Sequence, residues 1–288
     1  MATRTIHQII PAQKVNMGGH LLDQPLPANG VNHIDPFLLI HHWDKAVPAG
    51  LRPQEVGVPP HPHRGFSPVT FIYKGDLQHR DSLGNNAVVS AGGTQWMHAG
   101  KGITHSERPS AKMAAEGGEN EFIQFWVNTP ARFKMEVPYY LPLSAEDTPV
   151  IEQGKSQIAV VAGTYRDVIG PAKTYSPQLL LRVSGEAGEH LNLEIPANFN
   201  ALLYILNGDI ALGDQELSAK DMIWFNNDGD ELQIEVKNQT RFIVLSGEPI
   251  GEPVQSYGPF VMNTQTEVMQ AIRDAQQGKM GILIEEFD

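Results

Sequence analysis

The segment PVTFIYKGDL, residues 68–77, ends at a Gly-Asp turn, and its latter part FIYKGDL returns as YILNGDI at residues 204–210. A second pair of segments follows in the same order, SAGGTQWM at 90–97 and SAKDMIWF at 218–225. β-Branched and aromatic residues that lead into such turns predict strands. The copies lie 133 residues apart from Gly75 to Gly208, and 128 apart from Trp96 to Trp224. A repeat of this length predicts two copies of a whole domain, each a β-barrel or β-sandwich.

Further strands are expected in both halves, with one helix near the end. The stretch SAKMAAEGGENE, residues 110–121, reads as a loop, and the proline-rich stretch 139–148 reads as the linker between domains. At 267–281, Val268, Ile272 and Ala275 lie at helical spacing, and Gly278 is the expected stop. Strand-like runs bounded by turn residues lie at 86–92, 94–100, 121–128, 178–184, 190–196, 232–238 and 241–247.

Composition excludes several classes of function. The 288 residues include no cysteine, which rules out disulfides, thiolate metal ligands and a cysteine nucleophile. The net charge of −12 and the lack of a Lys/Arg run argue against direct nucleic-acid binding, which depends on basic side chains. No apolar run approaches the roughly 18 residues of a spanning helix, and the N-terminal segment has no signal-peptide pattern. We expect a cytoplasmic protein without membrane contact.

Two short motifs carry metal-binding side chains. His61-Pro62-His63 precedes the first repeated strand, and His105-Ser106-Glu107 follows the second. In an extended segment residues i and i+2 point to the same side, so each pair can converge on one point. Three imidazole nitrogens and one carboxylate oxygen suit a divalent first-row metal and leave coordination positions open. Open positions are typical of catalytic or ligand-binding sites.

A single H-x-H motif means little, and the repeat provides an internal comparison. Aligned on the Gly-Asp turns, His61 and His63 correspond to Glu194 and Pro196. Aligned on the tryptophans, His105 and Glu107 correspond to Gln233 and Glu235. We therefore expect one domain to hold the metal and the other to be scaffold. His41-His42 is as well explained by a polar strand end as by function.

The chain resembles the pirin family of the cupin superfamily over nearly its whole length. The resemblance is carried by HPHRGFSPVTFIYKGDLQHRDSLG at 61–84, GGTQWMHAGKGITHSERP at 92–109, SYGPFVMNTQTEVMQAIRDAQQGKMG at 256–281 and IDPFLLI at 34–40. It implies an all-β protein with two cupin barrels (double-stranded β-helix, or jelly roll) in tandem and a short C-terminal helix. Residues 1–140 would form the metal-binding cupin domain. Residues 141–288 would form a cupin domain that lacks the metal ligands and ends in the helix.

The resemblance also implies one divalent ion per chain, most simply Fe²⁺, held by His61, His63, His105 and Glu107. The donor types alone accept Mn, Co, Ni, Cu or Zn as well. The implied activity is that of a quercetin 2,3-dioxygenase, an oxidoreductase that acts on a flavonol with dioxygen, and Glu107 is the candidate general base.

Two alternatives remain from the sequence. One is a non-enzymatic regulator that binds a protein partner according to the state of its iron, and the other is an enzyme with a different small substrate. Many relatives carry an acidic residue after HPHRGF, where this chain has Ser67. The side chains expected to line a substrate pocket are Phe66, Phe71, His79, Met97 and His98.

Overall fold

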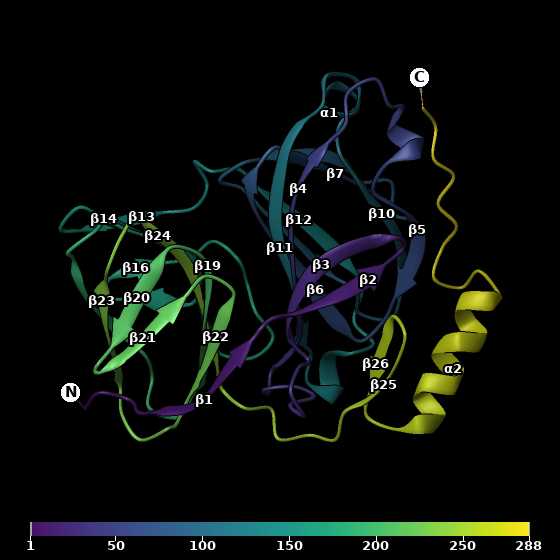
Figure 1. The fold of residues 1–288 in the computed structure, drawn as a ribbon. Coiled ribbons are helices and arrows are strands. Elements are labelled where there is room, and N and C mark those ends of the chain that lie inside the picture. The colour runs from purple at the N-terminus through teal and green to yellow at the C-terminus, as the bar shows by residue number, and fades with distance from the viewer. Residues whose placement is uncertain (1, 288) are drawn as a thin grey trace. The chain divides into compact units, whose positions relative to one another are not determined.

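The chain folds into two units of antiparallel strands, and each unit draws on two separate stretches of sequence. We call residues 42–147 and 251–288 the histidine unit, and residues 1–41 and 148–250 the apolar unit. The computed structural model describes residues 2–287 (Figure 1).

The histidine unit holds two sheets. One contains the neighbouring strands β12-β9-β6-β11-β4, and the other has the order β5-β10-β7-β8. Within β7 buried residues alternate with partly exposed ones, as expected for a strand with one side toward a core. The strands are β4 (Phe37–Val47), which starts in the apolar unit, β5 (Val58–His63), β6 (Phe66–Lys74), β7 (Asp76–Asp81), β8 (Asn86–Ser90), β9 (Thr94–His98), β10 (Ile103–Arg108), β11 (Gly118–Asn128), β12 (Tyr139–Leu143), β25 (Gln255–Tyr257) and β26 (Phe260–Met262).

The helices of the histidine unit are short. Helix α2 (Gln265–Gln276) begins with a capping box, in which Thr264 and Glu267 satisfy each other's backbone N–H groups. The others are α1 (Ala111–Glu116) and the 3-10 turns η1 (Pro53–Glu55) and η2 (Ala131–Phe133). No helix among residues 2–287 is long and apolar enough to cross a lipid bilayer.

The apolar unit repeats the two-sheet plan. One sheet has the order β1-β22-β19-β24-β17-β14-β13, and the other β18-β23-β20-β21. Their facing sides share one core of buried leucine, isoleucine and valine. The strands are β1 (Ile6–Pro11), β2 (Gln13–Met17), β3 (His20–Leu26), β13 (Val150–Gln153), β14 (Ser156–Ala162), β15 (Thr164–Tyr165), β16 (Val168–Ile169), β17 (Gln178–Gly185), β18 (His190–Glu194), β19 (Asn200–Asn207), β20 (Asp209–Leu212), β21 (Gln215–Ser218), β22 (Asp221–Phe225), β23 (Glu231–Val236) and β24 (Thr240–Gly247).

The predicted fold class is confirmed, with mostly strands, two cupin domains and a short C-terminal helix. One local prediction was wrong, and another was right only in part. Within the expected loop 110–121, residues Ala111–Glu116 form α1, because Ser110 accepts the Met113 N–H as an N-cap. Within the expected linker 139–148, residues Tyr139–Leu143 pair with β9, since extended proline-containing chain can still occupy the edge of a sheet. The boundary between the two units nevertheless lies in this stretch, between residues 147 and 148.

The two compact units of the structure do not follow the predicted division of the chain at a single boundary between residues 140 and 141. The N-terminal strand β1 pairs with β22, which places the start of the chain in the apolar unit. Helix α2 lies in the histidine unit with residues 251–288. The division into a metal-binding domain at 1–140 and a metal-free domain at 141–288 stays a prediction.

Candidate metal centre

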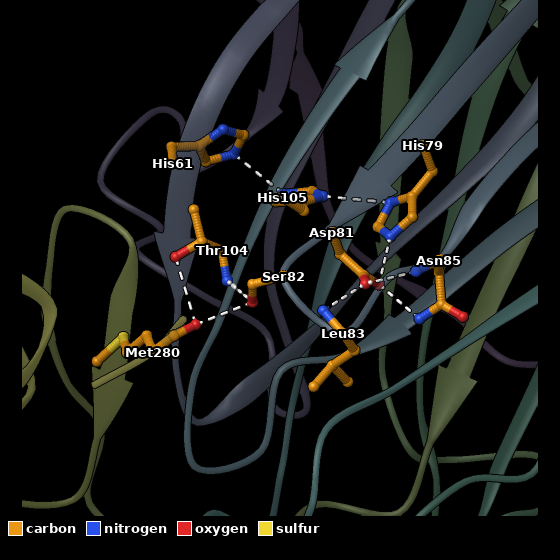
Figure 2. A network of polar contacts seen from close by, with 9 residues as sticks. All are labelled: His61, His79, Asp81, Ser82, Leu83, Asn85, Thr104, His105 and Met280. Atoms are coloured by element: carbon orange, nitrogen blue, oxygen red, sulfur yellow. Dashed lines mark hydrogen bonds and ion pairs between the residues drawn. The ribbon is translucent and has the colours of Figure 1, made fainter. Parts of the chain in front are cut away.

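Three histidines from two neighbouring strands converge on one point. His61 and His63 lie on β5, and His105 lies on β10 directly opposite His61 in the sheet register. One ring nitrogen from each of the three lies within 4.8 Å of the other two. The Nε2 atoms of His105 and His61 are 3.0 Å apart (Figure 2). The structure thus brings the three predicted histidine ligands together.

The protein fixes which nitrogen of each ring carries the hydrogen. His61 Nδ1 lies 2.9 Å from the Pro59 carbonyl oxygen, and His63 Nδ1 lies 3.3 Å from that of Pro259. A carbonyl oxygen only accepts, so both Nδ1 atoms carry hydrogen and both Nε2 atoms keep a lone pair. His105 makes its Nδ1 contact with His79 Nδ1 at 3.4 Å. All three imidazoles therefore use Nδ1 for contacts with the protein, and His61 and His105 turn Nε2 toward each other.

This arrangement fits a bound cation. Burial lowers the pKa of His63 and His105 well below the usual range, and the charges of the neighbouring histidines act in the same direction. Both rings are therefore neutral ligands. Two lone pairs that face each other at 3.0 Å would be satisfied by a cation held between them. The donor set suits a divalent first-row metal.

Glu107 borders this cluster. It lies two residues beyond His105 on β10, so both side chains leave the same side of the strand. Its two carboxylate oxygens accept from Gln124 Nε2 at 2.9 and 2.8 Å, and the same amide lies 3.2 Å from Thr70 Oγ1. Glu107 is not among the residues whose ligand atoms lie within 4.8 Å of one another. Its place as the fourth ligand stays a prediction.

Aromatic and apolar side chains surround the histidines. The rings of Phe66 and Trp126 lie 5.1 and 5.5 Å from that of His63, and 4.3 Å from each other. His79 stacks on Tyr140 with ring centroids 3.8 Å apart, and Met97 packs with Tyr140. Three of the predicted pocket residues, Phe66, His79 and Met97, therefore lie on the cluster's side of the sheet.

The structure does not bring Phe71 and His98 to the cluster. Side chains alternate across β6, so Thr70, which contacts Gln124, faces one way and Phe71 faces the other. Phe71 packs on Phe125 with ring centroids 5.0 Å apart. His98 Nδ1 lies 3.2 Å from Ser67 Oγ on that same opposite face. Burial lowers the pKa of His98 to about 4.

Ser67 therefore also faces away from the histidines. The acidic residue that many relatives carry at this position would point away from the cluster as well. Its absence leaves the three histidines and Glu107 unchanged.

Four side chains around the site were not selected from the sequence: Asp81, Gln124, Trp126 and Tyr140. Asp81 could have been found, because His79-Arg80-Asp81 repeats the i, i+2 spacing of the other two motifs on β7. Gln124 and Tyr140 lie on β11 and β12, far along the chain from the histidines. Only the sheet topology brings them close.

The apolar unit carries leucine and isoleucine where the histidine unit carries its ligands. Sheet pairing matches β5 with β18 and β10 with β23, which puts Leu193, Ile195, Leu232 and Ile234 at the positions of His61, His63, His105 and Glu107. All four are buried in the core. The sequence alignment to Glu194, Pro196, Gln233 and Glu235 was therefore one residue off. A one-residue shift moves every side chain to the other face of the sheet, so the alignment selected residues on the wrong face.

A second group of potential ligands lies on another part of the histidine unit. His42, Asp44 and Glu121 offer ligand atoms within 4.8 Å of one another. His42 Nε2 lies 3.4 Å from Glu121 Oε1, and the Lys74 ammonium lies 3.6 Å from Glu121 Oε2. A lysine charge already compensates this buried carboxylate, so the three-histidine cluster remains the stronger metal site.

A strand carrying H-x-H beside a strand carrying H-x-E, within a barrel of antiparallel sheets, defines a cupin, and a second barrel on the same plan makes the chain a two-domain cupin. Residues 19–127 match the Pirin family, and residues 180–281 match the Pirin C-terminal cupin domain. The chain belongs to the pirin family.

Individual relatives agree with this assignment. The chain is 36% identical over 257 residues to Pirin-like protein 2 of Arabidopsis thaliana, covering 86% of this chain and 76% of that protein. A crystal structure named quercetin 2,3-dioxygenase from Acinetobacter baumannii matches with a TM-score of 0.92 and 33% identity, over 98% of this chain and all of that one. Bacterial pirin YhhW of Escherichia coli, solved in complex with nickel(II), shares the fold with a TM-score of 0.66 at 20% identity, over 84% of this chain and 99% of that one.

Proposed function

We propose that the protein is an iron-dependent dioxygenase of the quercetin 2,3-dioxygenase type that acts on flavonols. His61, His63, His105 and Glu107 would hold the ion. The observation that carries the proposal is the convergence of one ring nitrogen from each of His61, His63 and His105 beside the Glu107 carboxylate. The match to the Acinetobacter baumannii structure named for this activity supports it. The cytoplasmic location expected from the sequence stays a prediction.

Bound ferrous iron would supply Lewis acidity toward the flavonol 3-hydroxyl and electron transfer with dioxygen. In the overall reaction two oxygen atoms enter the flavonol, the central ring opens, and carbon monoxide leaves. Glu107 is the group placed to take the hydroxyl proton on one of its carboxylate oxygens. Gln124 donates to both of those oxygens, and so holds the carboxylate on the cluster's side of β10.

The surroundings suit a flat aromatic substrate. Phe66, Trp126 and Met97 provide apolar surface near the histidines. Trp126 Nε1 and Tyr140 Oη are buried with no hydrogen-bond partner among the described residues, so both are available to polar groups of a ligand. Burial raises the pKa of Tyr140, and the charges of Glu107 and Asp81 raise it further. The Tyr140 hydroxyl therefore stays protonated and can donate to a flavonol oxygen.

The first prediction concerns turnover. We expect protein loaded anaerobically with ferrous iron to consume dioxygen and bleach quercetin, and we expect His61→Ala and Glu107→Ala to reduce both rates to background. One variant removes a ligand and the other the proton acceptor. Oxygen uptake and flavonol absorbance are followed together. His33→Ala and Glu194→Ala, which change exposed residues in the apolar unit, are the matched controls and should retain wild-type rates.

Wild-type protein that binds iron stoichiometrically yet consumes no oxygen with any flavonol contradicts the proposal. That result would favour the alternative function, a metal-dependent regulator that binds a protein partner. Full activity in Glu107→Ala would contradict the role of the carboxylate alone.

A further inference from the structure

A buried Asp-His pair lies behind the metal-facing side of His105. Asp81 and His79 are on β7, next to β10 in the sheet, and His79 Nε2 lies 2.9 Å from Asp81 Oδ2 (Figure 2). The other nitrogen of His79 is the one that meets His105 Nδ1 at 3.4 Å. Both side chains of the pair are almost fully buried. A continuous chain of contacts thus runs from Asp81 through His79 to His105.

The Asp81 carboxylate is held as an acceptor only. Its Oδ1 accepts the backbone N–H groups of Leu83 at 2.9 Å and Asn85 at 3.1 Å. Its Oδ2 accepts the Asn85 side-chain amide at 2.8 Å as well as His79. Hydrogen bonds to the charged form lower the pKa of Asp81 and outweigh the effect of its burial. His79 Nε2 must therefore be the donor in its contact with Asp81.

The position of the hydrogen on His79 then determines which nitrogen of His105 carries a hydrogen. With its hydrogen on Nε2, the neutral form of His79 presents a lone pair at Nδ1. His105 Nδ1 must donate to that lone pair, which leaves the lone pair of His105 on Nε2, 3.0 Å from His61 Nε2. The Tyr140 ring, parallel to His79 within 5°, restrains the plane of the relaying imidazole.

The apolar unit has no such pair. The position of His79 relative to its Gly-Asp turn is occupied there by Leu212, and that of Asp81 by Asp214. Leu212 belongs to the core and Asp214 is exposed. The Asp-His pair, which we call the relay, therefore occurs beside the candidate histidine ligands and is not repeated at the corresponding positions of the apolar unit.

We infer that His79 and Asp81 are positioning residues that fix His105 in the tautomer with its Nε2 lone pair toward the metal site. The inference rests on the proposed metal site and adds to it two residues that do not touch the ion. Partners of this kind orient a ligand ring and typically change metal affinity by about 10- to 100-fold.

Asp81→Asn tests the relay with almost no change of shape. Because the Oδ1 position receives two backbone N–H groups, the amide oxygen belongs there and the NH₂ group falls opposite His79 Nε2. The Asn85 side-chain amide, which donates to Oδ2 in the wild type, can rotate to present its oxygen to this NH₂ group. His79 would then accept at Nε2 and donate from Nδ1, which forces the hydrogen of His105 onto Nε2. We expect the affinity for Co²⁺, measured by calorimetry and by the cobalt absorption bands, to fall about 10- to 100-fold. Asp214→Asn is the matched control and should keep wild-type affinity.

A second variant and a second measurement keep the test decisive. His79→Phe retains a ring to stack on Tyr140 and leaves the Asp81 turn intact, yet removes the acceptor for His105 Nδ1, so it should lose cobalt affinity to a similar extent. Two-dimensional ¹⁵N NMR of the imidazoles in metal-free protein should show His105 protonated on Nδ1 in wild type and on Nε2 in Asp81→Asn. A purely structural role would not invert the tautomer.

Wild-type cobalt affinity in folded His79→Phe, or an unchanged His105 tautomer in Asp81→Asn, overturns the inference. These measurements use neither flavonol nor dioxygen. A protein that binds cobalt in this way but shows no turnover would contradict the dioxygenase proposal and leave the positioning role intact. A wild-type protein with no cobalt affinity would overturn both.

Discussion

At the residue scale, the chemistry of the site depends on which nitrogen of each imidazole the protein occupies. Pro59 and Pro259 supply carbonyl oxygens for His61 and His63, and His79 supplies the acceptor for His105. His61 and His105 thus turn the same atom, Nε2, toward each other. Imidazoles held this way would bind a cation without first rearranging their hydrogen bonds, which favours tight binding.

The carboxylate of Glu107 depends on one donor in the same manner. Gln124→Leu removes the amide that donates to both carboxylate oxygens. We expect metal affinity to fall by up to about 10- to 100-fold, because the candidate fourth ligand loses its orientation. A competition titration with a coloured chelator measures this. Gln78→Leu, on the partly exposed face of β7, is the control. Equal affinity of Gln124→Leu and wild type would show that Gln124 does not position Glu107.

The three histidines could be predicted from the sequence because residues i and i+2 of a strand point to the same face, as His61 and His63 do on β5. The same logic extended to Asp81 would have revealed the relay. It could not reveal Gln124 or Tyr140, whose contacts depend on strand order. It also could not exclude Phe71 and His98 from the pocket, because the sequence does not tell which face of the sheet is turned toward the histidines.

At the element scale, register decides which face of a strand is functional. β10 pairs with β5 so that His105 opposes His61, whereas the matching pair of the apolar unit opposes Leu232 to Leu193. A comparison based on turns and tryptophans found the right strands. It missed their register by one residue, because the loop before the strand differs in length between the copies.

Helix α2 is tied to the ligand strand by an ion pair. Arg64, the residue after His63, donates from Nη1 to Asp274 Oδ2 at 2.9 Å. The hydrogen bonds from Arg64 and then Gln270 lower the pKa of Asp274 to about 2. The unfolded value is about 3.9, so the folded state favours the ionised carboxylate. This contribution to stability is fully present above the unfolded pKa and is lost as the pH falls toward 2.

Asp274→Asn should therefore destabilise the protein in a pH-dependent way. At pH 7 we expect the free energy of unfolding to fall by about 1.5–3 kcal/mol, the usual contribution of a hydrogen bond to a charged group. The difference from wild type should shrink as the pH is lowered from about 4 toward 2. Urea unfolding curves across this range measure it, with the exposed Glu152→Gln as control. A difference that stays constant with pH would contradict the assignment.

At the scale of the whole molecule, the same fold occurs twice, once with an apolar interior and once with a cluster of histidines in its interior. The apolar unit fills its barrel with leucine, isoleucine and valine. The histidine unit carries the candidate metal ligands at the corresponding positions of its strands. The tandem arrangement was predictable, because the turns and tryptophans recur at nearly equal separations. The interleaving of chain segments between units was not, since it depends on where β1 and α2 lie.

The metal content of the purified chain tests the central claim most directly. Protein loaded anaerobically with ferrous iron, freed of excess metal and analysed by elemental mass spectrometry should carry one iron per chain. The double variant His63→Ala/His105→Ala should carry none, and Leu193→Ala, which changes the position matching His61 in the apolar unit, should still carry one. Iron retained by the histidine double variant, or no iron in the wild type, would contradict the account.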